Sequence, residues 1–215
     1  MNDSLTELVF ILDKSGSMAG LEADTIGGYN AMLARQKQEP GRVLVSTVLF
    51  NDGYERLHDR VELDAGLAPL SERDYSTSGS TALLDALGRS IHHIIKAHRR
   101  ARDNERPGRT LFVVTTDGHE NASRRYSYRA IKALVEREKR KYGWEFIFLG
   151  ANIDAIGAAA DLGIDADRAA HYHADGEGTQ ANFRAVGEAI SELRATRQVS
   201  GRWREEIDDD YRRRK

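Results

Sequence analysis

Short runs of hydrophobic residues alternate with longer amphipathic stretches along most of this 215-residue chain. Runs such as Leu5–Leu12 and Val43–Phe50 are rich in β-branched and aromatic residues, which is typical of strands buried on both faces of a sheet. Stretches such as Thr81–Ala101 instead carry apolar residues at helical spacing. The pattern predicts strands at 5–12, 43–50, 54–63, 110–116, 144–149 and 168–172, and helices at 21–37, 81–101, 127–141, 153–162 and 179–194.

The order of these elements predicts the fold class. Parallel strands need crossover connections, and helices in those connections cover both faces of the sheet. The sequence Asn51-Asp52-Gly53 is a strong hairpin signal, so the strand at 54–63 should be antiparallel and lie at an edge. We therefore predict an α/β fold with a doubly wound, mostly parallel six-stranded sheet, one antiparallel edge strand and helices on both faces.

A single domain is expected over residues 1–196, because no linker rich in Pro, Gly or Ser divides the chain. Residues 197–215 end in three aspartates and, after Tyr211, four basic residues. Separate blocks of acidic and basic residues cannot be buried in a hydrophobic core, so this segment is expected to be a charged helix end or tail in solvent.

Composition narrows the function classes. The 32 Lys and Arg residues nearly balance the 34 Asp and Glu residues, which argues against a dedicated nucleic-acid binder. No cysteine is present, which removes disulfides, thiolate metal sites and cysteine nucleophiles and agrees with a reducing compartment. The first apolar run lacks a basic stretch before it and is too short to span a bilayer. These features predict a cytoplasmic protein without a signal peptide or membrane anchor.

Oxygen-bearing side chains gather in three loops beside the predicted strands. Asp13, Ser15 and Ser17 follow the first strand, Thr81 opens the long middle helix, and Asp117 follows the strand at 110–116. Ligands of open parallel sheets bind where loops leave the carboxyl ends of the strands, so the three loops should share one rim. A donor set made only of oxygen favours a hard cation such as Mg²⁺ over zinc or copper.

These five residues, on this succession of strands and helices, resemble the metal-ion-dependent adhesion site (MIDAS) of von Willebrand factor type A (VWA) domains. That family's motif is D-x-S-x-S, a threonine in a second loop and an aspartate in a third. The resemblance implies Mg²⁺ or Mn²⁺ at Asp13, Ser15, Ser17, Thr81 and Asp117, a central first strand, and a partner protein that donates an Asp or Glu carboxylate to the metal. Without cysteines or a leader, the chain is more similar to bacterial stand-alone, intracellular members than to secreted adhesive ones.

Further residues are candidates for the rim of this site. Lys14, His119 and Glu120 stand beside the five candidate ligands and are expected to contact the partner. A simpler interpretation of the loops is helix capping by Ser17 and by Ser80 or Thr81, with Asp117-Gly118 as an ordinary turn. Capping alone does not account for all three loops together.

The same residues allow other functions to be considered. Asp13 could be the nucleophile of a metal-dependent phosphohydrolase, but Ser15 stands where haloacid-dehalogenase-like enzymes have a second aspartate, so we expect no catalysis. The arginine-rich stretch within 96–109 could serve a ribonucleoprotein, although a solvated helix end explains it as well. His171 and His173 with Asp175 lack an evident third convergent metal ligand, and His119-Glu120 fails the H-E-x-x-H zinc pattern at Ser123.

Overall fold

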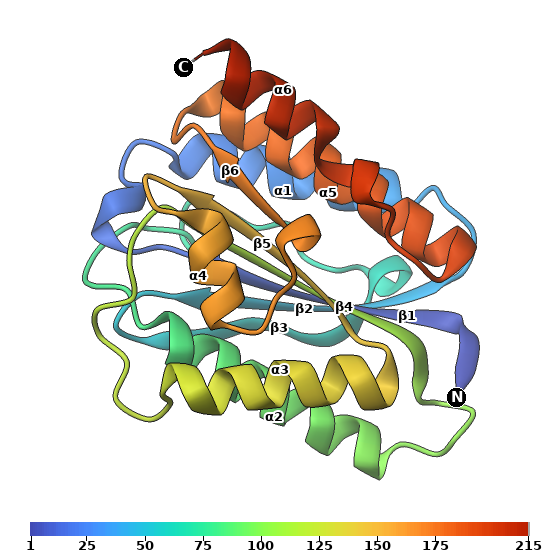
Figure 1. Ribbon diagram of the computed structural model, residues 1–215. Coiled ribbons are helices and arrows are strands. Elements are labelled where there is room, and N and C mark those ends of the chain that lie inside the picture. Colours follow the sequence, from blue (N-terminus) through green and yellow to red (C-terminus); the bar gives the residue numbers. More distant parts are fainter. Residues whose placement is uncertain (215) are drawn as a thin grey trace.

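A six-stranded sheet forms the centre of the computed structural model, which describes residues 1–214 (Figure 1). The strand order is β3-β2-β1-β4-β5-β6, with β1 and β4 in the middle. The strands are β1 (Asn2–Asp13), β2 (Arg42–Phe50), β3 (Tyr54–Glu62), β4 (Pro107–Thr116), β5 (Glu145–Ala151) and β6 (Ala169–Tyr172).

Strand directions follow from the connections. All neighbouring pairs are parallel except β2 and β3, which the turn at residues 51–53 joins as an antiparallel hairpin. Asp13 at the end of β1 is in register with Phe50 at the end of β2, and Leu12 is in register with Thr115 near the end of β4. The carboxyl ends of the three strands therefore meet at one edge. The predicted fold class, with its antiparallel edge strand, is confirmed.

Helices cover both faces of the sheet (Figure 1). They are α1 (Glu22–Gln36), α2 (Leu83–Arg100), α3 (Tyr128–Tyr142), α4 (Ala155–Asp161), α5 (Gly176–Thr196) and α6 (Glu205–Arg213). One core lies between the sheet and helices α1, α5 and α6, and a second lies between the sheet and helices α2, α3 and α4. No helix within residues 1–214 has the length and apolar character needed to cross a membrane.

Aromatic packing ties α1 to the sheet and to α5. The Tyr29 ring meets the Phe10 ring edge to face, with centroids 5.3 Å apart, and the Phe183 ring of α5 at 6.3 Å. The Tyr29 hydroxyl lies 2.5 Å from the Thr47 hydroxyl, so the one polar atom of this buried side chain has a partner. These contacts fix α1, and with it the loop between β1 and α1 that carries candidate ligands.

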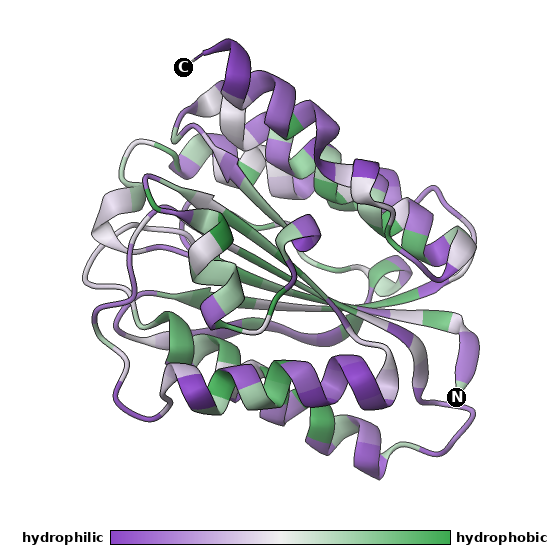
Figure 2. Ribbon diagram, viewed as in Figure 1, coloured by the Kyte–Doolittle hydropathy of each residue, from purple (hydrophilic) through white to green (hydrophobic). Residues whose placement is uncertain are grey.

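The charged segment beyond residue 196 packs against the domain, whereas its composition suggested a solvated end. Trp203 and Ile207 are 5% and 1% exposed and belong to the core, and the Trp203 indole donates a hydrogen bond to the Asp167 carbonyl at 2.8 Å. The physical reason is that two apolar side chains suffice to dock this segment: Trp203 lies in the short helical turn Gly201–Arg204, and Ile207 lies in the first turn of α6. Hydrophilic residues dominate the rest of α6 (Figure 2).

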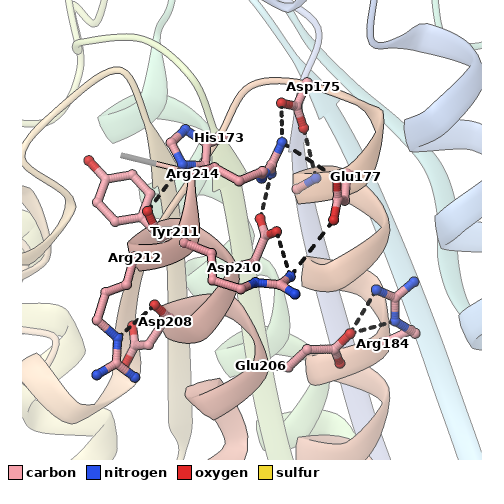
Figure 3. A network of polar contacts seen from close by, with 12 residues as sticks. His173, Asp175, Glu177, Arg184, Glu206, Asp208, Asp210, Tyr211, Arg212 and Arg214 are labelled. Carbon is pink, nitrogen blue, oxygen red and sulfur yellow. Dashed lines mark hydrogen bonds and ion pairs between the residues drawn. The ribbon is translucent and has the colours of Figure 1, made fainter.

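Ion pairs attach the outer face of α6 to α5 (Figure 3). Arg184 of α5 lies 2.7 Å from Glu206, and Arg214 lies 2.5 Å from Asp175, whose carboxylate also accepts the Gly178 N–H at the start of α5. This cap explains why α5 begins at Gly176, three residues earlier than its apolar pattern predicts. The division of the chain at residue 196 stays a prediction.

Candidate metal centre

The three loops predicted to share a rim do meet at the carboxyl ends of β1 and β4. The Ser17 hydroxyl donates a hydrogen bond to the Asp117 carboxylate, and its oxygen lies 3.2 Å from the Ser15 hydroxyl. A Cβ placed on Gly118 would lie 3.1 Å from the Ser17 hydroxyl oxygen and 3.4 Å from that of Thr81. The structure thus brings serine, threonine and aspartate oxygens from three loops to one place.

Asp13 is held in this cluster by its neighbours. It is the last residue of β1 and is only 1% exposed. The Ser15 N–H donates to its Oδ1 at 2.7 Å, and the Thr116 hydroxyl donates to its Oδ2 at 2.5 Å. The buried Tyr75 hydroxyl donates to the Asp13 main-chain carbonyl. Both the carboxylate and the backbone of Asp13 are therefore positioned by groups from three different segments.

Backbone hydrogen bonds hold the loops against one another. The Gly16 N–H donates to the Gly79 carbonyl at 3.0 Å, and the Ser78 N–H donates to the Lys14 carbonyl at 2.9 Å. The loop after β4 is tied in by Asn121, whose side-chain oxygen accepts the Thr81 N–H at 2.9 Å. Gly79 has a φ of +75°, a conformation that glycine adopts without steric cost. This local geometry fixes where the hydroxyls project.

Negative charge in the centre has no basic partner. Among residues 1–214, no ion pair involves Asp13 or the 3% exposed Asp117. Burial raises the pKa of Asp13, against hydrogen bonds from Thr116 and Ser15 that lower it, and the nearby Asp117 charge raises it further. Burial likewise raises the pKa of Asp117, against the hydrogen bond from Ser17. Two buried carboxylates without a counter-charge are an environment that a cation stabilises.

The donor set therefore fits a hard cation. Two carboxylates and three hydroxyls are oxygen donors of the kind that Mg²⁺ and Mn²⁺ prefer. In the described part of the chain, no group of three or more His, Asp or Glu side chains is arranged to hold a metal ion. Any metal in this centre would depend on the hydroxyl oxygens as well as on the two carboxylates.

Helix capping does not account for the hydroxyls. No side chain caps the short helical turn at Gly16–Met18 or helix α1, and the N-cap of α2 is Ala82. Glu120 and Ser123 perform this role for α2: the Glu120 carboxylate accepts the Leu84 N–H at 2.9 Å, and the Ser123 hydroxyl accepts the Asp85 N–H at 3.0 Å. The Ser17 and Thr81 hydroxyls are thus not engaged as helix caps.

The expected rim residues differ in their surroundings. The Lys14 ammonium forms an ion pair with Glu55 at 2.7 Å. The Glu120 carboxylate, besides its bond to Leu84, accepts the main-chain N–H groups of Ala122 and Ser123 at 3.0 and 2.7 Å. His119 is exposed and lines a small cavity with His171 and His173. Of the three, only His119 makes none of the ion pairs or hydrogen bonds that hold Lys14 and Glu120. Contact of all three residues with a partner stays a prediction.

His171 and His173, considered above as a possible second metal site, instead make structural contacts. His171 accepts the Ala155 N–H at 3.1 Å, and His173 donates to the Tyr211 carbonyl at 3.2 Å. Both imidazoles stack on the Tyr211 ring, and Asp175 caps α5 and pairs with Arg214. These contacts give the cluster a role in docking α6 (Figure 3).

Three residues of the centre were not anticipated from the sequence. Tyr75, Thr116 and Asn121 hold the carbonyl of Asp13, the carboxylate of Asp13 and the backbone of Thr81, respectively. The apolar run at 110–116 places Thr116 in a strand, and the turn that follows places Asn121 in a loop, but neither pattern indicates these contacts. The one available signal was Tyr75 itself, an isolated aromatic residue in the polar segment Ser71–Thr81.

Several solved structures with the same fold are von Willebrand factor type A domains. The von Willebrand factor domain of the type V pili tip protein Mfa5 from Porphyromonas gingivalis has a TM-score of 0.60 and 13% identity, over 86% of this chain and 95% of that one. A von Willebrand factor type A protein from Catenulispora acidiphila has a TM-score of 0.59 and 13% identity, over 86% of this chain and 42% of that one. No protein-family model and no curated protein matches the sequence.

A third similar structure carries a metal. Proximal thread matrix protein 1 from the mussel byssus, solved with a zinc-occupied MIDAS motif, has a TM-score of 0.61 and 15% identity, over 86% of this chain and 45% of that one. The present chain spans less than half the length of the byssus and Catenulispora proteins. The chain therefore has the Rossmann-like fold of VWA domains, and identities this low establish the fold alone.

Proposed function

We propose that this protein is a non-catalytic, metal-dependent binding module. It holds Mg²⁺ or Mn²⁺ through the five predicted ligands, Asp13, Ser15, Ser17, Thr81 and Asp117, and engages a carboxylate of a partner protein. The observation that carries the proposal is the pair of buried aspartates, which lie beside the hydroxyls of Ser15, Ser17 and Thr81 and have no basic counter-charge among residues 1–214. The zinc-occupied MIDAS of a protein with the same fold supports metal binding at this place.

The chemistry of the centre explains why a carboxylate is the expected partner group. A divalent cation held by only two charged ligands remains electrophilic, because hydroxyl oxygens neutralise little of its charge. An Asp or Glu from a partner adds a third negative charge and a directional bond. The fold places the loops at the molecular edge where ligands of open parallel sheets bind. A cytoplasmic location remains a prediction from the sequence.

A hydrolase has less support. A phosphohydrolase that used Asp13 as its nucleophile would need a neighbouring acid or base to move a proton. Ser15 occupies the expected position of that residue, and its hydroxyl lies against Ser17. The Asp13 carboxylate itself already accepts two hydrogen bonds. These contacts favour positioning of a ligand over nucleophilic attack.

Calorimetric titration of Mg²⁺ and Mn²⁺ tests the metal assignment. We expect saturable binding of one ion to the wild-type protein and no detectable binding to Asp13→Ala, because that variant loses a charged ligand without loss of core packing. Asp52→Ala removes a carboxylate from a neighbouring loop at the same end of the sheet and should retain binding. Circular dichroism checks that each variant is folded. Equal affinity of Asp13→Ala and the wild type would contradict the assignment.

An affinity pull-down from lysate tests the partner assignment. Tagged wild-type protein in Mg²⁺ should retain proteins that are lost in EDTA and are not retained by Asp13→Ala. The same set of proteins in all three conditions would contradict metal-dependent engagement.

A further inference from the structure

A groove lined by arginines lies directly beside the candidate metal centre. Its volume is about 680 Å³, and its lining includes Arg89 of α2 and Arg124 and Arg125 of the loop after β4. We call this groove, which Arg89, Arg124 and Arg125 line, the arginine groove. Ser80 and Asn121 also line it, and they flank the metal centre: Ser80 precedes Thr81, and Asn121 exchanges hydrogen bonds of 2.9 and 3.0 Å with the Thr81 backbone.

The positive charges of the groove are available to a ligand. Arg89, Arg124 and Arg125 are exposed, and within residues 1–214 none of them has a carboxylate within ion-pair distance. Arg89 lies over the Tyr54 ring, 3.8 Å from its centroid, which holds the guanidinium in place without neutralising it. Most guanidinium groups around α6, within the described residues, are instead paired with aspartates or glutamates.

The loop that presents Arg124 and Arg125 is rigidly attached. Asp85, in the first turn of α2, accepts the main-chain N–H groups of Arg124, Arg125 and Tyr126 at 3.1, 2.9 and 3.0 Å. The Asp85 carboxylate is therefore occupied by the backbone and sets the position of the two arginines. Asp52 is the other acidic residue of the lining and lies at the end of the groove beside Gly79.

We infer that the arginine groove binds an acidic segment of the partner protein, one of whose carboxylates reaches the metal. This inference rests on the proposed function and adds the chemistry of the partner to it. Guanidinium groups bind carboxylates through paired, charge-assisted hydrogen bonds, which makes consecutive acidic side chains the complementary ligand. Because Ser80 and Asn121 line the groove and adjoin Thr81 of the metal centre, one extended segment can occupy both.

Fluorescence anisotropy with a labelled hexaglutamate peptide, and a hexaglutamine peptide as its neutral counterpart, tests the inference. In Mg²⁺ we expect the wild-type protein to bind hexaglutamate and not hexaglutamine. The double variant Arg124→Gln/Arg125→Gln should bind at least tenfold more weakly. The matched control Arg129→Gln/Arg140→Gln removes the same charge from exposed positions of α3, outside the groove, and should stay within twofold of the wild type.

The controls separate failure of the groove from failure of the metal site. Calorimetry should give unchanged Mg²⁺ binding in Arg124→Gln/Arg125→Gln. If EDTA abolishes peptide binding but the groove variant binds like the wild type, the groove assignment is wrong and the metal-dependent function stands. If the groove variant loses binding but EDTA has no effect, the peptide does not reach the metal and the combined site is wrong. Absence of hexaglutamate binding, or tighter arginine-dependent binding of a uridine hexanucleotide, would also overturn an acidic protein segment as the ligand.

Discussion

At the scale of single residues, Asp13 combines deep burial with negative charge. It ends β1 directly after the buried, apolar residues Leu8–Leu12, and it is as inaccessible as they are. Burial raises its pKa, so the ionised carboxylate costs folding free energy when no cation is bound. Such a residue is explained by a ligand that offsets its charge rather than by stability of the isolated fold.

This charge predicts a pH-dependent stability in the absence of metal. A carboxyl group whose folded-state pKa lies above the unfolded value near 3.8 destabilises the folded state at neutral pH. The penalty shrinks as the pH falls below the folded-state pKa and is gone near the unfolded value. In EDTA at pH 7, Asp13→Asn should therefore be more stable than the wild type, and the difference should shrink toward pH 4. Urea unfolding at several pH values measures this. A variant less stable than the wild type by the same amount at every pH would contradict the account.

At the scale of elements, the packing of α1 against α5 depends on a small residue at their contact. A Cβ added to Gly28 would lie 2.4 Å from a ring carbon of Phe183, which is a severe overlap. The adjacent Gly27 is exposed, and a Cβ there would meet no atom within 4 Å. The two neighbouring glycines lie in the same helix, but only Gly28 packs against α5.

Alanine substitutions at these two glycines should therefore change stability in opposite directions. Gly27→Ala should stabilise the protein by about 0.5–1 kcal/mol, because alanine is the better helix former. Gly28→Ala should destabilise it by about 1–3 kcal/mol, because the Phe183 ring must move out of a packed core. Denaturant unfolding gives both values. Stabilisation by both substitutions would show that α1 and α5 do not pack as described.

The sequence predicted these elements well wherever one pattern dominated. Apolar runs predicted four of the strands clearly and β6 weakly, and the hairpin signal at Asn51–Gly53 predicted β3 as an antiparallel edge strand. The D-x-S-x-S motif and the separate Thr81 and Asp117 gave five residues that the fold does bring to one rim. The supporting contacts of Tyr75 and Asn121 were out of reach, because they join segments about 40 or more residues apart through single polar atoms. Local periodicity carries no information about such pairs.

At the scale of the whole molecule, the C-terminal segment completes one face of the sheet. Charge composition concealed this role, because the few apolar side chains of this segment, Trp203 and Ile207 among them, are interspersed with many charged ones. The surrounding ion pairs to α5 are surface contacts, which typically contribute little to stability. The two buried side chains are therefore expected to provide most of the attachment of α6.

A substitution at Trp203 measures that attachment. Trp203→Ala should lower the free energy of unfolding by about 3–5 kcal/mol, because it leaves a cavity and removes the bond to the Asp167 carbonyl. The neighbouring Arg202 is exposed, so Arg202→Ala should change stability by less than about 0.5 kcal/mol. Equal, small changes in the free energy of unfolding for both substitutions would indicate that α6 is a solvated tail and not docked on the sheet.

The central claim is that one divalent cation is held by Asp13, Ser15, Ser17, Thr81 and Asp117. Its most direct test is a crystal structure of the protein with Mn²⁺, with anomalous scattering used to locate the ion. We predict a single strong peak at the rim where the three loops meet, within coordination distance of oxygens from all three, and loss of that peak in Asp13→Ala. A peak elsewhere, or none at this rim at saturating Mn²⁺, would contradict it.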